Sequence, residues 1–306
     1  MPIVGENKYF TLIRTPDGDN DAWLAQRRKG IGGSDVAAIM GLSHYRGPYE
    51  VWAEKLGYIP PADLSDNEAV EWGNILEPIV GGHYASQHPD RIVRRVNAVC
   101  QSIERPHAQA SLDYEVKDPE LGWGILEIKT ASLYREHDWD DGVPIYYITQ
   151  ITHYMSVTGR KFADVAVLIG GQIYKEFRVM RDDDDVRAVN KEVDDFWSMV
   201  EGDVEPPIGE VGAEIKALLA KHRTPGELVD MGSTPKEATD WLKAKESRDA
   251  AVKEYQGAVN RLCQLIGDNR GIVTPDGRFT WSRYKKNGQD TNGGIRFAAA
   301  AKKEKE

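Results

Sequence analysis

The chain of 306 residues is short of cysteine, of long apolar runs and of positive charge. Its two cysteines, Cys100 and Cys263, lie far apart without the spacing of a metal site, so we expect both to be reduced and buried, as in a cytoplasm. The apolar stretches are too short to cross a bilayer, and the first residues do not show a charged start followed by an apolar core. These absences predict a cytoplasmic protein without a membrane partner.

The formal net charge of −10 at pH 7 excludes a protein that coats nucleic acid through its bulk charge. It does not exclude an enzyme that holds nucleic acid in a cleft, because a few local basic groups are sufficient there. Such groups occur in three clusters, which are Arg27-Arg28-Lys29, Arg91 with Arg94 and Arg95, and Arg160-Lys161.

Charged residues with catalytic potential lie in an alternating apolar run. The segment Gly124-Ile-Leu-Glu-Ile-Lys-Thr130 has the period of two that is typical of a β-strand. Side chains two apart on a strand point to the same face, so we expect Glu127 and Lys129 to project together and Ile128 to project from the other face.

A second acid, Asp113, precedes this strand by a segment that is typical of a turn. Asp118, Pro119 and Gly122 favour turns, and a hairpin built on them would bring Asp113 beside Glu127. Two carboxylates next to a lysine are what a Mg²⁺-dependent phosphodiesterase needs, because hard oxygen ligands hold the metal and a cation lies beside the attacking water or the scissile phosphate. The alternative for this pattern alone is a set of exposed charges on an edge strand.

The remaining patterns predict a larger domain and an extension. Helical periodicity alternates with strand patterns along the first 200 residues, which predicts an α–β–α core with a mixed central sheet. A stretch rich in Pro and Gly at residues 203–209 predicts a boundary, so the first domain covers residues 1–205 and the extension covers residues 206–306. For the extension we expect a long helix ending near Ile266, a β-hairpin and a frayed tail from Ala298 to Glu306.

Two helices near the candidate residues carry local expectations of their own. Ser34 is predicted to be the N-cap of a short helix that follows a glycine-rich turn. Residues 66–88 are predicted to form one long helix with Pro78 inside it. The inner side of that helix is expected to carry the apolar residues Val70, Ile75, Ile79, Val80 and Tyr84.

Several motifs occur in the order seen in one known family. They are Trp23-Leu-Ala-Gln-Arg27, Ile31-Gly-Gly-Ser-Asp35, Trp72-Gly-Asn-Ile-Leu-Glu77, Ser111-Leu-Asp113, Leu126-Glu-Ile-Lys129 and Gln150-Ile-Thr-His-Tyr154. Each motif is weak alone, but their order and spacing over residues 15–200 resemble the YqaJ-type viral recombinases. These are phage alkaline exonucleases related to lambda exonuclease, in the PD-(D/E)XK nuclease superfamily. The resemblance implies an α/β (α+β) fold with a restriction-endonuclease-like core, a mixed central sheet and flanking helices.

The resemblance also implies roles for the residues of the strand motifs. Asp113 and Glu127, with the backbone carbonyl of Ile128, would hold catalytic Mg²⁺, for which Mn²⁺ is a candidate substitute. Lys129 would orient the water or offset the charge that develops on the phosphate. Glu77 matches an acid that family members carry on a helix beside the metal.

Four residues on other helices match the family as well. Gln150 and Tyr154 would support the metal cluster and the nucleophilic water. Arg27 and Ser34 match residues that hold the DNA 5′ phosphate, and a glycine-rich turn into a helix N-terminus beside an Arg suits an anion. The structural alternatives are a core aromatic for Tyr154, an ordinary surface residue for Gln150 and a simple N-cap for Ser34.

The function implied is a Mg²⁺-dependent 5′-to-3′ exonuclease that binds the ends of linear double-stranded DNA. It would leave 3′ single-stranded overhangs for a phage single-strand annealing protein. The alternatives are a PD-(D/E)XK endonuclease and a non-catalytic DNA-binding recombination factor.

We expect a homo-oligomer, a trimer or tetramer ring with Arg91, Arg94 and Arg95 facing a channel. The alternative is a monomer whose hairpin at Arg278–Lys286 clamps DNA. The segment between Asp113 and Glu127 is longer than the tight turn of compact family members, which leaves the strand pairing open.

Overall fold

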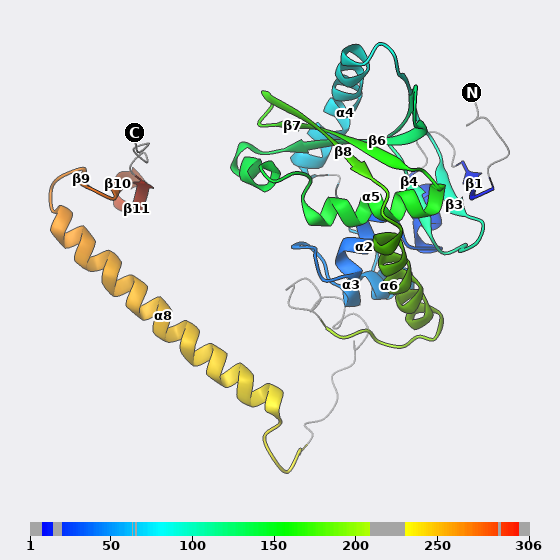
Figure 1. The fold of residues 1–306 in the computed structure, drawn as a ribbon. Coiled ribbons are helices and arrows are strands. Elements are labelled where there is room, and N and C mark those ends of the chain that lie inside the picture. The colour runs from blue at the N-terminus through cyan, green and yellow to red at the C-terminus, as the bar shows by residue number, and fades with distance from the viewer. Residues whose placement is uncertain are drawn as a thin grey trace. The chain divides into compact units, whose positions relative to one another are not determined.

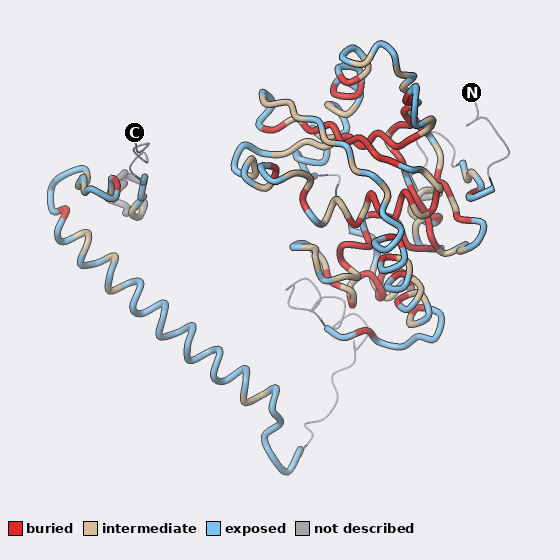
Figure 2. The backbone as a smooth tube through the Cα atoms, viewed as in Figure 1, coloured by how far each residue is buried: buried red, intermediate tan, exposed pale blue. Residues whose placement is uncertain are grey.

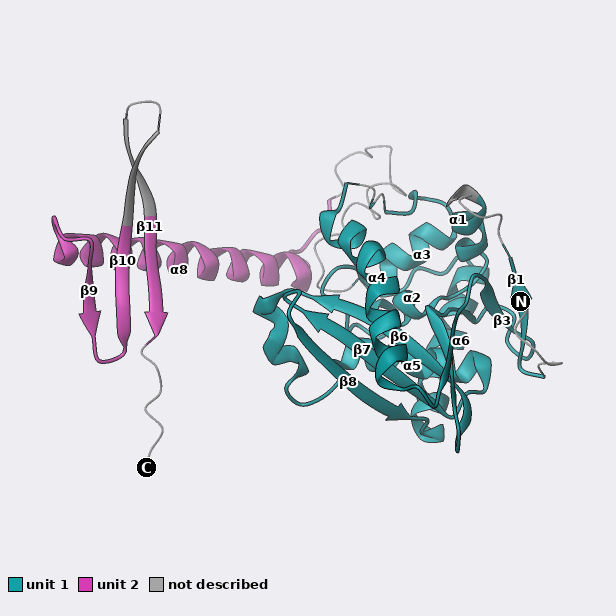
Figure 3. Cartoon of the chain, turned by 90° about the horizontal axis from the view of Figure 1, so that it is seen from above, with its two compact units in different colours: residues 1–225 teal, residues 226–306 magenta. Residues whose placement is uncertain are grey.

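The computed structural model describes residues 8–14, 20–62, 64, 66–208, 230–286 and 289–299. The chain divides into two compact units, residues 1–225 and residues 226–306 (Figure 3). The domain boundary expected after residue 205 stays a prediction, because residues 209–229 lie outside the described part of the chain. Of the helices in that part, none is both long and apolar enough to cross a membrane.

A five-stranded mixed sheet forms the centre of the first unit (Figure 1). Its order is β2-β5-β6-β7-β8, in which β6 and β7 run parallel and the other neighbours run antiparallel. The strands are β2 (Ile92–Arg95), β5 (Tyr114–Asp118), β6 (Gly122–Ala131), β7 (Phe162–Ile169) and β8 (Ile173–Met180). The predicted mixed sheet is therefore confirmed.

Strand burial follows strand position in this sheet. The near-continuous apolar run of β7 is buried almost throughout, as expected for a strand covered on both faces. At the edge, β8 alternates over its last residues between half-buried and exposed side chains. Between β7 and β8 the chain turns through Gly170 and Gly171, whose φ angles are 59° and 72°. This left-handed pair forms the tight hairpin that a Gly-Gly dipeptide favours.

The helix α4 (Glu68–Gln87) covers one face of the sheet and α5 (Ile145–Thr158) covers the other. Residues of α2 (Gly33–Ile39), α3 (Pro48–Lys55) and α6 (Asp183–Glu201) form a further cluster, in which α2 and α6 also contact α5. The chain also contains α1 (Asn20–Arg28) and the 3₁₀ helix η1 (Leu133–Trp139) after β6. A small antiparallel sheet of β1 (Phe10–Ile13), β3 (Val99–Ser102) and β4 (Gln109–Ser111) completes the unit. Because α5 connects β6 to β7, it provides the crossover that two parallel strands require.

The core lies between these layers (Figure 2). On one face, Ile125 and Val165 pack in the same cluster as Ile151 and Met155 of α5. On the other face, Leu126 and other side chains from β6 and β7 pack with residues of α4. Alternation along β6 therefore sends its odd-numbered side chains toward α5 and its even-numbered ones toward α4.

The helix α4 confirms the predicted long helix but not its predicted inner side. Asn67 caps it by accepting hydrogen bonds from the N–H groups of Ala69 and Val70, and the helix continues through Pro78. Val80 and Tyr84 are buried, as expected. The expectation was wrong for Val70, Ile75 and Ile79, which are 37%, 46% and 61% exposed. Only the second half of α4 is buried against the sheet, so helical periodicity alone overestimated its buried length.

The second unit consists of α8 (Lys236–Ile266) and an antiparallel sheet of β9 (Gly271–Thr274), β10 (Gly277–Lys286) and β11 (Gln289–Ala299). The predicted long helix and hairpin are present. The third strand, β11, was not predicted, and it includes Ala298 and Ala299 of the tail that was expected to fray. Residues 300–306 lie outside the described part of the chain.

A buried histidine connects α5 to two other segments of the first unit. The Nε2 atom of His153 lies 3.1 Å from the carbonyl oxygen of Ile31 and 3.0 Å from that of Gln109. Both partners are acceptors, so Nε2 carries the proton and donates. Burial lowers the pKa of His153 from 6.5 to about 4.

This histidine makes stability depend on pH in a predictable direction. Between pH 6.5 and 4 the unfolded chain binds a proton at His153 that the folded chain does not, so the free energy of unfolding falls as pH falls. From pH 7 to pH 5 we expect His153→Gln to lose about 2 kcal/mol less than the wild type. Urea unfolding at both pH values measures this difference, with His137→Gln, at an exposed position, as control. Parallel losses in all three proteins would contradict the prediction.

Candidate active site

The hairpin of β5 and β6 places Asp113 beside the β6 acid. Asp118 Oδ1 accepts hydrogen bonds from the N–H groups of Glu120 and Leu121, and the turn ends at Gly122, whose φ is 78°. The strands pair from Tyr114↔Leu126 to Asp118↔Gly122. The long segment after Asp113 is therefore mostly paired strand, which settles how the two strands pair.

Asp113, Glu127 and Lys129 meet at the end of this hairpin, as the strand period predicts. Asp113 Oδ2 accepts a hydrogen bond of 2.9 Å from the N–H of Ile128. Lys129 Nζ lies 2.7 Å from Glu127 Oε1, so the two side chains share a face of β6. The sequence therefore placed these three side chains correctly relative to one another, whatever their function.

Gln150 and Tyr154 of α5 join the same cluster. Gln150 Nε2 donates to Glu127 Oε1 at 2.9 Å and lies 3.0 Å from the Tyr154 hydroxyl. Tyr154 is also 4% exposed and part of the core, so the structural alternative for Tyr154 and the site contact are both true. Gln150 does not fit its alternative, because an ordinary surface residue would not bond a buried carboxylate.

The carboxyl groups around this cluster all have raised pKa values. Burial, and then the charge of Asp113, raise the pKa of Glu127 to about 8. Burial also raises the pKa of Asp113, and burial and then Asp113 raise that of Glu77, although Arg95 Nη2 lies 3.0 Å from Glu77 Oε1. Three neighbouring carboxyls that resist ionisation mark a position where a bound cation would be stabilised.

The donor set fits a divalent metal with oxygen ligands. Glu127 Oε2 is buried and receives no hydrogen bond from any described residue, so one carboxylate oxygen is available as a ligand. Within the described residues no three His, Cys, Asp or Glu side chains form a ready metal cluster. Asp113, Glu127 and the Ile128 carbonyl would supply the protein's oxygen ligands to such a metal, and waters would supply the rest.

Arg27 and Ser34, the predicted phosphate residues, contact one another. Arg27 Nη2 lies 3.1 Å from Ser34 Oγ and 3.4 Å from Asp35 Oδ1. The prediction that Ser34 caps the helix was wrong, because Gly32 is the N-cap and Ser34 lies inside the seven-residue α2. Gly32 takes an extended conformation and its N–H donates to Asp35 Oδ2. The helix therefore begins two residues earlier than an N-cap at Ser34 would place it.

A glycine brings this pair close to the carboxylate cluster. A Cβ atom added to Gly33 would lie 2.4 Å from the ring of Tyr154 and 2.7 Å from Cγ of Gln150. Any side chain at this position would clash, so the start of α2 packs directly on the α5 residues that contact Glu127. The two predicted groups of residues are therefore joined by packing between α2 and α5.

Comparison with known proteins finds a family whose sequence model matches part of the chain. Residues 22–161 match the sequence model of the YqaJ-like viral recombinase domain. This part of the chain is therefore similar to that family. The resemblance read from the motifs is confirmed.

Relatives of this YqaJ-like domain differ in how much of the chain they share. The chain is 35% identical over 190 residues to the uncharacterized protein YqaJ of Bacillus subtilis (strain 168), which covers 61% of this chain and 58% of that protein. It is 35% identical over 65 residues to protein D345L of African swine fever virus (strain Badajoz 1971 Vero-adapted), covering 21% of this chain and 18% of that protein. The chain thus spans less than two thirds of either relative.

A solved structure has a similar fold. The alkaline exonuclease LHK-Exo from Laribacter hongkongensis aligns with a TM-score of 0.50 and 22% identity, over 66% of this chain and all of that one. The likeness shows a common mixed α/β fold and confirms the expected fold class.

Sequence reasoning missed a buried ion network in the YqaJ-like domain. Asp35 is fully buried, and its Oδ2 lies 2.7 Å from Nζ of the equally buried Lys55. Arg46 lies 3.4 Å from Asp35 Oδ1 and 2.7 Å from Glu54. Burial raises the pKa of Asp35, but the attraction of Lys55, Arg27 and Arg46 is stronger and holds it well below its usual range. Asp35 thereby fixes the guanidinium of Arg27.

The basic cluster expected to face a channel is largely paired within the first unit. Arg91 lies 3.0 Å from Asp164, and Arg94 lies 2.8 Å from the fully buried Glu115. Arg95, which contacts Glu77, is the member of this trio with a half-exposed side chain, at 53%. The positive charges of Arg91 and Arg94 are therefore balanced by acids on other strands of the same sheet.

Proposed function

We propose that this protein is a metal-dependent deoxyribonuclease that degrades linear double-stranded DNA from its 5′ ends. The observation that carries the proposal is the buried Glu127, which has one carboxylate oxygen without a donor among described residues and lies beside Asp113 and Lys129. The similarity of residues 22–161 to the YqaJ-like viral recombinase domain supports it. Degradation in the 5′-to-3′ direction would leave 3′ single strands, which a phage annealing protein would take up.

In this proposal each side chain has a task that its contacts support. Mg²⁺, or Mn²⁺ in its place, would be held by Asp113, Glu127 and the Ile128 carbonyl, and would supply Lewis acidity toward the phosphate and its attacking water. Lys129 places a positive charge beside the reacting phosphate. Gln150 fixes the orientation of the Glu127 carboxylate through the contact at Oε1.

Supporting residues complete the proposed site. Tyr154 holds the Gln150 amide, and Glu77 adds an acid near Asp113. Arg27 and Ser34 would bind the 5′ phosphate of the strand end, since guanidinium and hydroxyl groups suit phosphate oxygens. A trimeric or tetrameric ring around DNA stays part of the proposal, with Arg95 as the half-exposed charge of its basic cluster.

Release of acid-soluble nucleotides from labelled DNA tests the proposed activity. An exonuclease releases nucleotides from linear duplex with Mg²⁺, releases none with EDTA, and leaves covalently closed circles intact. Cleavage of closed circles would identify an endonuclease instead. No release from any substrate, together with retained DNA binding, would identify a non-catalytic recombination factor.

Arg27→Lys is expected to slow degradation of 5′-phosphorylated ends at least about tenfold more than degradation of 5′-hydroxyl ends, a difference of about 1.4 kcal/mol. The lysine keeps the positive charge near Asp35 but lacks the planar fork of donors that matches a phosphate. Initial rates on both substrates measure the effect. Arg187→Lys is the control, because Arg187 is 70% exposed on α6 and pairs with Asp184 on the same helix. An equal loss on both ends would show that Arg27 is structural.

A further inference from the structure

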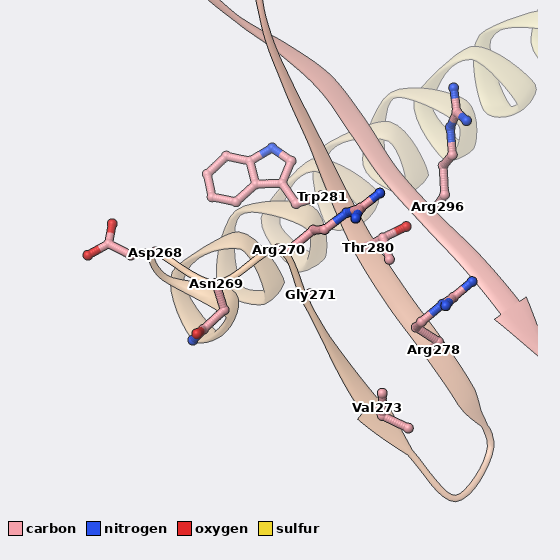
Figure 4. A pocket seen from close by; sticks show the side chains of 9 residues that line it. All are labelled: Asp268, Asn269, Arg270, Gly271, Val273, Arg278, Thr280, Trp281 and Arg296. Carbon is pink, nitrogen blue, oxygen red and sulfur yellow. The ribbon is translucent and has the colours of Figure 1, made fainter.

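The sheet of the C-terminal unit has a hollow on one face that the proposed nuclease site does not use. Its volume is about 850 Å³, and Arg270, Arg278 and Arg296 line it (Figure 4). Among the described residues that line this hollow, Asp268 is the one acidic residue. Three guanidinium groups thus share one hollow with a single carboxylate.

Strand register explains why these arginines lie together. In β10 and β11, Arg278 is opposite Ala298 and Thr280 is opposite Arg296. Arg278 and Arg296 are therefore diagonal neighbours on one face of the sheet, at roughly 7–8 Å. Arg270 directly precedes β9, and its carbonyl oxygen accepts a hydrogen bond of 3.0 Å from the N–H of Trp281. This bond holds Arg270 beside β10.

The opposite face of the same sheet has a different character. Phe279 and Phe297, which are cross-strand partners, have ring centroids 4.6 Å apart. The alternation along β10 and β11 therefore separates an apolar face from an arginine face. We call Arg270, Arg278 and Arg296 the arginine face.

The three arginines of this face lack acidic partners among the described residues, unlike most other arginines in the described part of the chain. Arg270, Arg278 and Arg296 form no ion pair with a described side chain, whereas Arg91 and Arg178 of the first unit both pair with Asp164. Residues 267–299 contain six Lys and Arg against three Asp and Glu, in a chain with 39 against 49. Unbalanced charge concentrated on one sheet face of an acidic protein indicates an anionic partner.

We propose that the arginine face binds the phosphodiester backbone of single-stranded DNA. Guanidinium groups suit the phosphate oxygens of a nucleic-acid backbone, and three of them line one hollow. The choice of DNA rests on the proposed function, because degradation of one strand of a duplex produces a single strand. The second unit would hold that product strand outside the nuclease site.

The test measures salt-dependent binding in the full chain. Fluorescence anisotropy follows a labelled oligothymidylate in EDTA over a series of NaCl concentrations, with Glu127→Gln in every protein to prevent cleavage. Arg278→Gln with Arg296→Gln is compared with Arg248→Gln and Arg261→Gln, two exposed arginines of α8 that carry the same charge in the same unit. The control pair leaves the arginine face intact.

We expect the face variant to bind about tenfold more weakly and to lower the slope of log affinity against log salt by about 1.4, since each phosphate contact on a single strand contributes about 0.7. The control should retain both values. Equal losses in both variants, or no loss in either, would overturn the proposal. Nucleotide release is measured separately, so loss of the proposed nuclease function would leave this result readable.

Discussion

Glu127→Gln is expected to lower nuclease activity by at least about 10³-fold, roughly 4 kcal/mol of barrier, while the chain stays folded. The amide keeps the shape of the carboxyl and its place beside Lys129 and Gln150. It removes the negative charge with which Glu127 would attract a divalent cation, and an amide nitrogen is a much poorer metal ligand than the carboxylate oxygen Oε2. Asp113→Asn and Lys129→Met are expected to cause losses of similar size, because the three groups act on one reacting phosphate.

Thermal melting separates this chemical effect from unfolding. Burial raises the pKa of Glu127 to about 8, so the folded chain without metal favours the neutral carboxyl that Gln imitates. At pH 7 in EDTA we therefore expect Glu127→Gln to melt at or above the wild-type temperature. The sign follows from linkage: a carboxyl whose pKa is raised on folding stabilises the fold at low pH, and loses that contribution as pH rises from 4.5 to about 8.

A matched substitution controls for general charge effects. Glu176 lies on the edge strand β8, where its side chain is 28% exposed and pairs with His88. Glu176→Gln removes the same charge from the same sheet and should keep wild-type activity. If Glu127→Gln retained activity within about tenfold of the wild type, roughly 1.4 kcal/mol, Glu127 would have no catalytic role.

The relative positions of Asp113, Glu127 and Lys129 could be predicted because they depend on local rules. The period of two along β6 determines which side chains share a face, and turn residues determine where β5 returns. Gln150 and Tyr154 were placed by motif order, and the contacts at Glu127 Oε1 agree with it. Their proposed roles stay predictions.

Other features could not be predicted, because they depend on partners that are distant in the sequence. Arg94 appeared as free positive charge, but Glu115 on the neighbouring strand β5 neutralises it, as the register of β2 and β5 requires. The exposure of Ile79 depends on where α4 leaves the sheet, which helical periodicity does not indicate. β11 was missed because Gln289–Ala299 has few apolar residues, and its pairing with β10 defines it as a strand.

The pairing of Asp35 with Lys55 is the clearest long-range case, and it leads to a large expected effect on stability. Asp35→Asn should lower the free energy of unfolding by about 3–5 kcal/mol, because it leaves buried positive charge without a counter-charge. After this substitution Lys55 Nζ would keep only its 2.8 Å contact with the carbonyl oxygen of Arg27 among the bonds seen now. Arg46 and Arg27 would add repulsion at the same point.

Lys55→Met is the informative partner of this substitution, because the two losses should be unequal. Asp35 would retain Arg27 and Arg46, each 3.4 Å from Oδ1, so its charge would stay partly compensated. We therefore expect Lys55→Met to cost at least about 1 kcal/mol less than Asp35→Asn, and the double variant to recover part of the loss of Asp35→Asn.

Urea unfolding at pH 7 measures the wild type, the two single variants and the double variant. The pKa of Asp35 is held low, so its contribution is fully present above about pH 4 and is lost only as pH falls further. A loss below about 1 kcal/mol for Asp35→Asn, the usual size for a surface ion pair, would show that solvent reaches this network.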